Sequence, residues 1–285
     1  MVKKILGYSY IYLILLLMYI PILVLIVFSF TNATYIGTWN GLSFDLYGKL
    51  FQSEEIMIAV GNTIIIAVIS AVCATVLGTL GAVGAFYSKR RSRAVLENIN
   101  QIPVVNAEIV MALSLVVMFV FIGNNIFGGA NLFSFWTLLV GHIILAAPFV
   151  YLNVKPKLQQ MDPALYEAAL DLGCSPRQAL KKAVLPEIVP GVFSGFMLSI
   201  TLSLDDFIVT AFTRGSGLLS GAANIETIST LVQAKIKKGP IPPEMRPLTT
   251  IIFLIVLLVV IFISLRRNKT INVKSMKRRK LREKE

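Results

Sequence analysis

Long apolar stretches alternate with short polar ones along most of the 285 residues of this chain. Because an α-helix rises 1.5 Å per residue, roughly 20 apolar residues cross the hydrocarbon core of a bilayer. The apolar stretches predict six transmembrane helices, over residues 10–30, 60–87, 104–122, 132–152, 188–212 and 247–265. The pattern therefore predicts an all-α membrane protein without a soluble domain.

The second and fourth predicted helices carry features that a helical bundle explains. Gly78, Gly81 and Gly84 recur at three-residue spacing in the second helix. Small residues at such spacing let helix backbones approach closely in lipid, so we expect them to pack against another helix. His142, the single histidine, lies in the fourth helix, where a buried and hydrogen-bonded side chain is a better explanation than a proton relay.

Charge fixes the expected orientation. The formal net charge is +12, and the basic residues gather near the N-terminus, at residues 89–93, after the fourth predicted helix and in the tail from Arg266. An even number of helices separates these places, so all four lie on one side, which the positive-inside rule makes the cytoplasm. Five basic residues in the last outer loop run against this rule. Both termini are predicted to be cytoplasmic, and the tail to anchor on anionic lipid rather than to bind nucleic acid.

Three segments follow from these spans. Residues 1–57 form an N-terminal helix with an outer loop, residues 58–265 form the core, and residues 266–285 form a basic cytoplasmic tail.

The loop after the fourth predicted helix is polar and has the signals of a helical hairpin. Asp162 and Pro163 are typical of a helix start, and Gly173 is typical of a left-handed helix end. Ser175 and Pro176 repeat the start signal for a second helix, which we expect to end near residue 185. An apolar face is predicted on the first helix from Leu165, Ala168, Ala169 and Leu172.

The spacing within this hairpin resembles the EAA signature of ABC-importer permeases. Glu167-Ala168-Ala169, then Gly173, then Leu185-Pro186 match it, whereas Ala183 replaces the usual isoleucine. The resemblance implies the MetI-like permease fold and a hairpin that docks on a separate ATPase. It also implies a set of coupling residues: Glu167, Ala168, Ala169, Asp171, Gly173, Leu185 and Pro186.

Residues 105–119, 141–158 and 202–215 are similar to the polyamine-type permeases, in particular to the second permease subunit of spermidine and putrescine importers. This resemblance implies a multi-pass permease in the inner membrane of a bacterial cell. It also implies a homologous second permease, two ATP-binding subunits and an extracytoplasmic substrate-binding protein as partners. Two alternatives stay open, namely an ABC permease for another small solute (iron, a thiamine-type ligand or a sugar) and a stand-alone secondary transporter.

Acidic residues are the candidates for the substrate pathway. A charge inside a span costs a few kcal/mol and normally faces a cavity or a partner. The resemblance to polyamine-type permeases implies that Asp205 and Asp206 line the path of a cationic substrate, and Glu226 is expected to extend it. The alternative is that the aspartates cap a broken helix or neutralise Arg214. Glu108 is expected to be a helix-start charge.

No enzyme chemistry is predicted. The sequence has no G-x-x-x-x-G-K-[ST] phosphate loop, so ATP hydrolysis is expected on a partner chain. One histidine and two isolated cysteines predict neither a metal site nor a disulfide, and no cofactor is expected.

Overall fold

A computed structural model of the chain describes residues 2–33, 37–215, 225–239 and 242–258. These residues form two compact units. The larger unit runs from Glu55 to Lys237, and the smaller combines the described residues up to Glu54 with those from Lys238 onward. The structure is helical throughout the described ranges, as the apolar pattern predicts.

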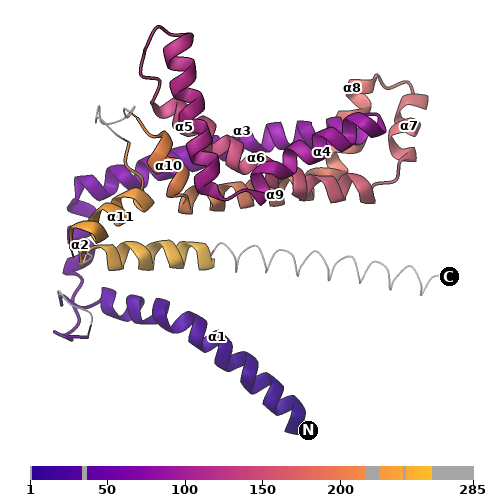
Figure 1. Cartoon of the computed structure of the whole chain (residues 1–285). Coiled ribbons are helices and arrows are strands. Elements are labelled where there is room, and N and C mark those ends of the chain that lie inside the picture. Colours follow the sequence, from indigo (N-terminus) through magenta and orange to yellow (C-terminus); the bar gives the residue numbers. More distant parts are fainter. Residues whose placement is uncertain (1, 34–36, 216–224, 240–241, 259–285) are drawn as a thin grey trace. The chain divides into compact units, whose positions relative to one another are not determined.

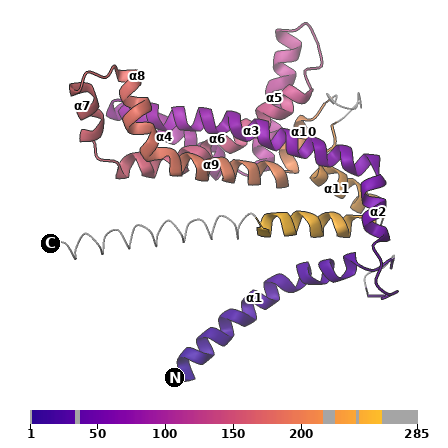
Figure 2. The ribbon, with the colours of Figure 1, turned by 180° about the vertical axis from the view of Figure 1, so that it is seen from behind.

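Three long helices form the body of the larger unit. They are α3 (Glu54–Tyr87), α6 (Phe135–Gln160) and α9 (Leu185–Asp205), which run side by side in both views (Figures 1 and 2). A Cβ atom added at Gly78 of α3 would lie 2.7 Å from the Ala147 carbonyl oxygen of α6. The packing role predicted for Gly78 is confirmed, because only a glycine permits this approach.

The helix α9 packs against the same stretch of α6, and glycines of both α3 and α9 approach Val150. A Cβ atom at Gly195 would lie 3.0 Å from the Val150 Cα atom, and one at Gly191 would lie 2.8 Å from the Asn153 carbonyl oxygen. Fully buried side chains, including Val150, Val154 and Ile188, fill the contact. Glycines therefore allow α3 and α9 to lie close to α6, and buried aliphatic side chains fill the remaining contact.

The third predicted span is displaced in the structure. Residues 104 and 105 belong to a separate helix, α4 (Arg90–Val105), which lies along α6, and α5 (Glu108–Asn125) then leaves the bundle in another direction (Figure 1). Asn106 and Ala107 have extended backbone, with ψ of 147° and 137°, so the two helices cannot be continuous. Glu108 is the first residue of α5, as its prediction as a helix-start charge requires.

The fifth predicted span, residues 188–212, is wrong at both ends. It continues a helical run that begins at α8 (Pro176–Ala179) and passes through a π-helical turn (Leu180–Val184) into α9. It stops at Asp205, because Asp206 has extended backbone with φ −62° and ψ 125°. The short α10 (Ile208–Thr213) follows the break, and α11 (Ile228–Lys238) lies further along the chain.

The smaller unit contains α1 (Val2–Ser29), α2 (Asp45–Gln52) and an apolar helix, Met245–Leu258. The Ser29 hydroxyl lies 2.9 Å from the Tyr47 hydroxyl, which joins α1 to α2. Arg246 Nη1 donates to the Ala33 carbonyl oxygen at 2.8 Å, which joins the apolar helix to the loop after α1.

Within the described ranges, five helices are long and apolar enough to cross a membrane. They correspond to the first five predicted spans. The helix Met245–Leu258 begins the sixth, but residues 259–265 and the basic tail 266–285 lie outside the described residues.

Candidate translocation site and coupling hairpin

The first helix of the hairpin, α7 (Ala164–Asp171), has the predicted signals at both ends. The Asp162 carboxylate accepts a hydrogen bond from the Ala164 backbone N–H at 3.0 Å, as a capping side chain does. At the other end Gly173 has φ +86°, and the N–H groups of Gly173 and Cys174 donate to the carbonyls of Leu170 and Ala169. This is a Schellman motif, so the predicted left-handed end is confirmed.

The second helix of the hairpin does not end near residue 185. A capping box starts it, in which the Ser175 N–H donates to the Gln178 side chain at 3.0 Å. The helical run then continues without interruption from Pro176 to Asp205. Pro186 follows directly after the π-helical turn and lacks a backbone N–H, yet the helical run passes through it. The hairpin and the fifth span are therefore one continuous helical element.

The hairpin presents polar and apolar side chains to the surroundings of the chain. Glu167, Ala168 and Asp171 are exposed, and Leu172 is 86% exposed at the turn. Leu185 and Pro186 are exposed as well. Tyr166 turns inward instead, and its ring centroid lies 5.0 Å from that of Tyr87 at the end of α3. Apart from the half-buried Ala169, the residues predicted to couple are thus exposed in the described part of the chain.

At the opposite end of α9, Asp206 has every oxygen engaged. Its carboxylate accepts from the N–H groups of Val209 at 3.2 Å and Thr210 at 2.8 Å, and from the Thr210 hydroxyl at 2.9 Å. The Ser229 hydroxyl of α11 donates to its backbone carbonyl at 2.6 Å. Asp206 is 6% exposed. Of the two readings left open, this geometry is that of an aspartate that caps a broken helix.

Around Asp206 lies a buried polar network from four helices. His142 of α6 lies 2.9 Å from the Thr210 hydroxyl through Nε2 and 2.8 Å from the Ser203 hydroxyl through Nδ1. The Ser70 hydroxyl of α3 donates to Ser203 at 3.2 Å. His142 is 1% exposed, so the prediction of a buried, hydrogen-bonded histidine is confirmed. Sequence reasoning missed its partners, because they are 61 and 68 residues away and share no local pattern.

Asp205 differs from its neighbour. It is the last residue of α9, its side chain is exposed, and it takes part in no ion pair within the described part of the chain. One residue of a helix turns the side chain by about 100°, which separates the two aspartates into different surroundings. An exposed carboxylate beside a buried, capped one leaves Asp205 as the aspartate that is free to meet a ligand.

The structure brings the Glu226 segment to the same end of the bundle. Asn62 Nδ2 of α3 donates to the Glu226 carbonyl oxygen at 3.0 Å, and Thr63 accepts from the Ile228 N–H at 2.9 Å. Ser229, three residues after Glu226, holds the Asp206 carbonyl. The half-buried Glu226 therefore lies in the segment that packs against the helix break.

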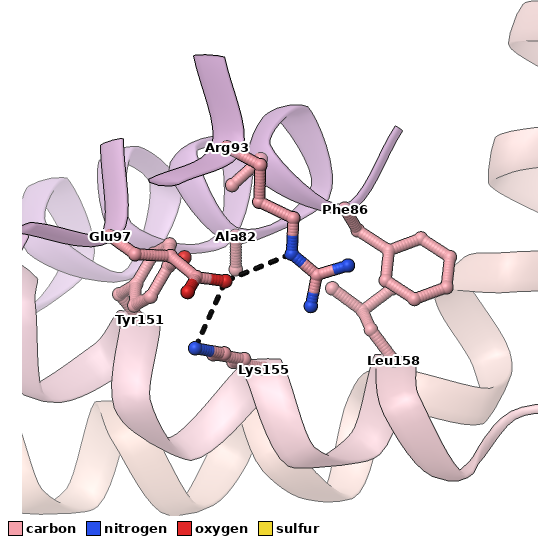
Figure 3. Close-up of a pocket in the computed structure, with 8 residues that line it drawn as sticks. Ala82, Phe86, Arg93, Glu97, Tyr151, Lys155 and Leu158 are labelled. Atoms are coloured by element: carbon pink, nitrogen blue, oxygen red, sulfur yellow. Dashed lines mark hydrogen bonds and ion pairs between the residues drawn. The ribbon is translucent and has the colours of Figure 1, made fainter. Parts of the chain in front are cut away.

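A charged cluster that the sequence did not reveal joins α4 to α6. The Glu97 carboxylate lies 2.9 Å from Arg93 Nε and 3.0 Å from Lys155 Nζ, above the Tyr151 ring (Figure 3). Hydrogen bonds from Arg93 and Lys155 lower the pKa of Glu97 below its ordinary value. The four-residue spacing of Arg93 and Glu97 on a helix was a usable signal. No sequence signal indicated that Lys155, 58 residues after Glu97, would pair with it.

The sequence also places the chain in a family. Residues 74–277 match the family of binding-protein-dependent transport system inner membrane components, and these residues are more than half of the chain. The chain belongs to this family. It is therefore an ABC-importer permease, a transport component of the membrane and not an enzyme, and the MetI-like fold predicted from the hairpin signature is confirmed.

Two relatives match over most of their length. The spermidine/putrescine transport system permease protein PotC of Escherichia coli strain K12 is 32% identical over 233 residues, covering 82% of this chain and 83% of the relative. The putrescine transport system permease protein PotI of the same strain is 30% identical over 227 residues, covering 79% and 78%.

Among solved structures, a bacterial alginate ABC transporter in complex with its alginate pentasaccharide-bound periplasmic protein has a chain of the same fold. The TM-score is 0.70 at 20% identity, over 92% of both chains. At that identity the likeness bears on the fold alone. The described residues contain no group of three or more His, Cys, Asp or Glu side chains that could hold a metal ion.

Proposed function

We propose that this chain is a permease subunit of an ATP-driven polyamine importer and forms half of the translocation pathway. The observation that carries the proposal is the similarity to PotC and PotI, at 32% and 30% identity over about four-fifths of the chain. Both relatives are named for spermidine or putrescine transport. The exposed Asp205 supports a cationic cargo, since polyamines carry several ammonium groups at neutral pH.

The proposed assembly contains a homologous second permease, two ATP-binding subunits and an extracytoplasmic binding protein. The proposed location is the inner membrane of a bacterial cell, with both termini and the hairpin in the cytoplasm. The placement of basic residues supports this orientation. The exposed coupling residues support an ATPase as the hairpin's partner, because an apolar, 86% exposed Leu172 beside Glu167 and Asp171 suits a groove on another protein.

The coupling mechanism rests on the continuity of the helical run from Pro176 to Asp205. When the ATPases close on ATP, the hairpin moves with the groove that holds it. Because α8, the π-helical turn and α9 form one element, the motion passes directly to the far end of α9. The 21 residues of α9 extend about 30 Å, which matches the hydrocarbon thickness of a bilayer. Hydrolysis then resets the pathway.

At that far end we assign the two aspartates different tasks. Asp206 holds the break between α9 and α10, since its carboxylate already accepts three hydrogen bonds. Asp205 is exposed and contacts an ammonium group of the cargo. Glu226, from the segment that packs against the break, extends the acidic path. A carboxylate at this depth lowers the electrostatic barrier that a cation otherwise meets in a bilayer.

The test is transport by the purified complex. The tagged chain would be isolated from its host membrane with whatever subunits co-purify, reconstituted in proteoliposomes with ATP, and supplied with its binding protein. Uptake of labelled spermidine and putrescine would be measured against a neutral sugar and thiamine. ATP-dependent uptake of a polyamine, with none of the two control solutes, is the expected result.

Two outcomes contradict the proposal in different ways. Uptake of the sugar or thiamine in place of polyamines would keep the importer and change the cargo. Polyamine uptake by this chain alone, without any ATP-binding subunit, would replace the importer by a secondary transporter.

A further inference from the structure

The break between α9 and α10 is held by a side chain from neither helix. His142 belongs to α6, yet its two ring nitrogens reach Ser203 in the last turn of α9 and Thr210 in α10. The two bonds therefore cross the break and tie both helix ends to the central helix of the bundle. Asp205 lies between Ser203 and the break, so its direction depends on how firmly this end of α9 is fixed.

We propose that His142 is a positioning residue of the translocation site, whose neutral imidazole fixes the break and thereby the direction of Asp205. The statement that Asp205 meets the cargo rests on the proposed function. The positioning of Asp205 by His142 does not, because it follows from the geometry of the described residues.

The hydrogen bonds assign the tautomer. The Asp206 carboxylate accepts from the Val209 and Thr210 N–H groups, and the Thr210 hydroxyl donates to it at 2.9 Å. The Thr210 oxygen then accepts from His142 Nε2–H at 2.9 Å, which leaves Nδ1 unprotonated. That nitrogen accepts from the Ser203 hydroxyl at 2.8 Å, and Ser203 accepts from Ser70 at 3.2 Å. Ser203, His142 and Thr210 thus all donate toward the carboxylate, and one neutral tautomer satisfies these three side chains.

The direction of these hydrogen bonds predicts which substitutions of His142 keep the connection between Ser203 and Thr210. The amide of glutamine offers an acceptor and a donor that can replace Nδ1 and Nε2–H. Asparagine has the acceptor near the Nδ1 position but is too short to reach Thr210. Leucine fills similar space and leaves both hydroxyls without their ring partner, which is costly for buried polar groups. The order of function expected from the network is therefore histidine, then glutamine, then asparagine, then leucine.

The experiment compares His142→Gln, His142→Asn and His142→Leu in the reconstituted complex. The cargo-free readout is the reactivity of Asp205→Cys with a small cationic thiol reagent, in a background carrying Cys73→Ser and Cys174→Ser. The second readout uses the complex with Asp205 intact. It measures the KM and the maximal rate of spermidine uptake separately, together with ATP hydrolysis stimulated by the binding protein.

We expect labelling of position 205 in His142→Gln to match the parent, and labelling in His142→Asn to fall by about threefold or more. With Asp205 intact, KM for spermidine rises about fivefold or more in His142→Asn and stays near the parent value in His142→Gln, while stimulated ATP hydrolysis is retained in both. His142→Leu extends the series where it yields a folded complex. The His142→Asn and His142→Gln pair decides the question without it.

Equal labelling at position 205 across histidine, glutamine and asparagine would overturn the proposal, whatever the uptake values are. A glutamine variant as impaired as the asparagine one would also overturn it, since the donor and acceptor pattern would then be irrelevant. If the parent complex takes up no polyamine, the proposed function fails, but the labelling series still decides whether His142 positions residue 205.

Discussion

Tyr166 of the hairpin packs against Tyr87 at the end of α3, with ring centroids 5.0 Å apart and ring planes at 46°. Tyr166 directly precedes Glu167, the first residue of the coupling signature. The first helix of the hairpin is thus held against α3, while the second continues into α9. In the proposed mechanism, motion of the hairpin would therefore act on two spans at once.

Removing the Tyr166 ring should weaken coupling without abolishing assembly. An aromatic pair contributes about 0.5–1.5 kcal/mol beyond its buried area, so Tyr166→Ala should lower ATP-driven uptake several-fold. Tyr166→Phe keeps the ring and should transport like the parent. Uptake per molecule of ATP hydrolysed is the measurement, and an alanine variant with parental coupling would show that the contact has no such role.

The hairpin surface should be needed for ATPase binding. Leu172 is 86% exposed in the described chain, so Leu172→Asp should leave the permease folded. It should abolish co-purification of the ATP-binding subunits, because a charge replaces an apolar contact in the groove. Leu172→Met keeps the apolar contact and is the matched control. Retention of the ATPases by a monodisperse aspartate variant would contradict the docking assignment.

Two glycines of α3 should respond oppositely to alanine. A Cβ atom added at Gly78 would lie 2.7 Å from the Ala147 carbonyl oxygen. A Cβ atom added at Gly84 would have no neighbouring atom within 4 Å. Gly78→Ala should destabilise by about 1–3 kcal/mol through overpacking. Gly84→Ala should be neutral or stabilise by up to about 1 kcal/mol, because alanine favours a helix. Thermal unfolding in detergent gives both values, and similar effects from the two changes would contradict the close contact between α3 and α6.

The Glu97 cluster should make stability depend on pH. Its pKa lies below the ordinary value of 4.5 in the folded chain, so the unfolded chain takes up its proton first as pH falls. The stabilisation is complete above pH 4.5 and is lost as pH falls through the lowered pKa. At pH 7 the parent should unfold about 1–3 °C above Glu97→Gln, and this gap should close below the folded pKa. A gap that is constant between pH 7 and the acid limit would contradict the ion pairing.

The sequence predicted the helices and the hairpin well because their signals are local. Apolar runs of membrane length, the Asp162-Pro163 start and Gly173 at the left-handed turn all act within a few residues. The continuity of the hairpin with α9 was obscured by Pro186, because a proline usually marks a helix boundary but here lies inside the run, just after the π-helical turn. The π-helical turn at Leu180–Val184 has no sequence signal that hydropathy detects.

The site was less accessible to sequence reasoning. The apolar residues after Asp206 led to a predicted fifth span that extends beyond Asp205. However, Asp206 before Phe207, Ile208 and Val209 is also a typical signal for the start of a new helix. The helix α4 was missed because its polar Glu97 faces α6 while apolar residues face outward, which reverses the usual pattern. The partners of His142 come from distant elements, so only the fold brings them together.

The central claim is that Asp205 meets the cationic cargo while Asp206 serves the fold. The most direct measurement is the KM of spermidine uptake by the reconstituted complex carrying Asp205→Asn, with thermal unfolding and binding-protein-stimulated ATP hydrolysis recorded on the same sample. The account predicts a KM at least about tenfold higher, equivalent to about 1.4 kcal/mol, with parental unfolding temperature and hydrolysis. Asp206→Asn should instead lower the unfolding temperature, since its carboxylate accepts three hydrogen bonds. Parental KM and maximal rate of spermidine uptake in Asp205→Asn would contradict the account.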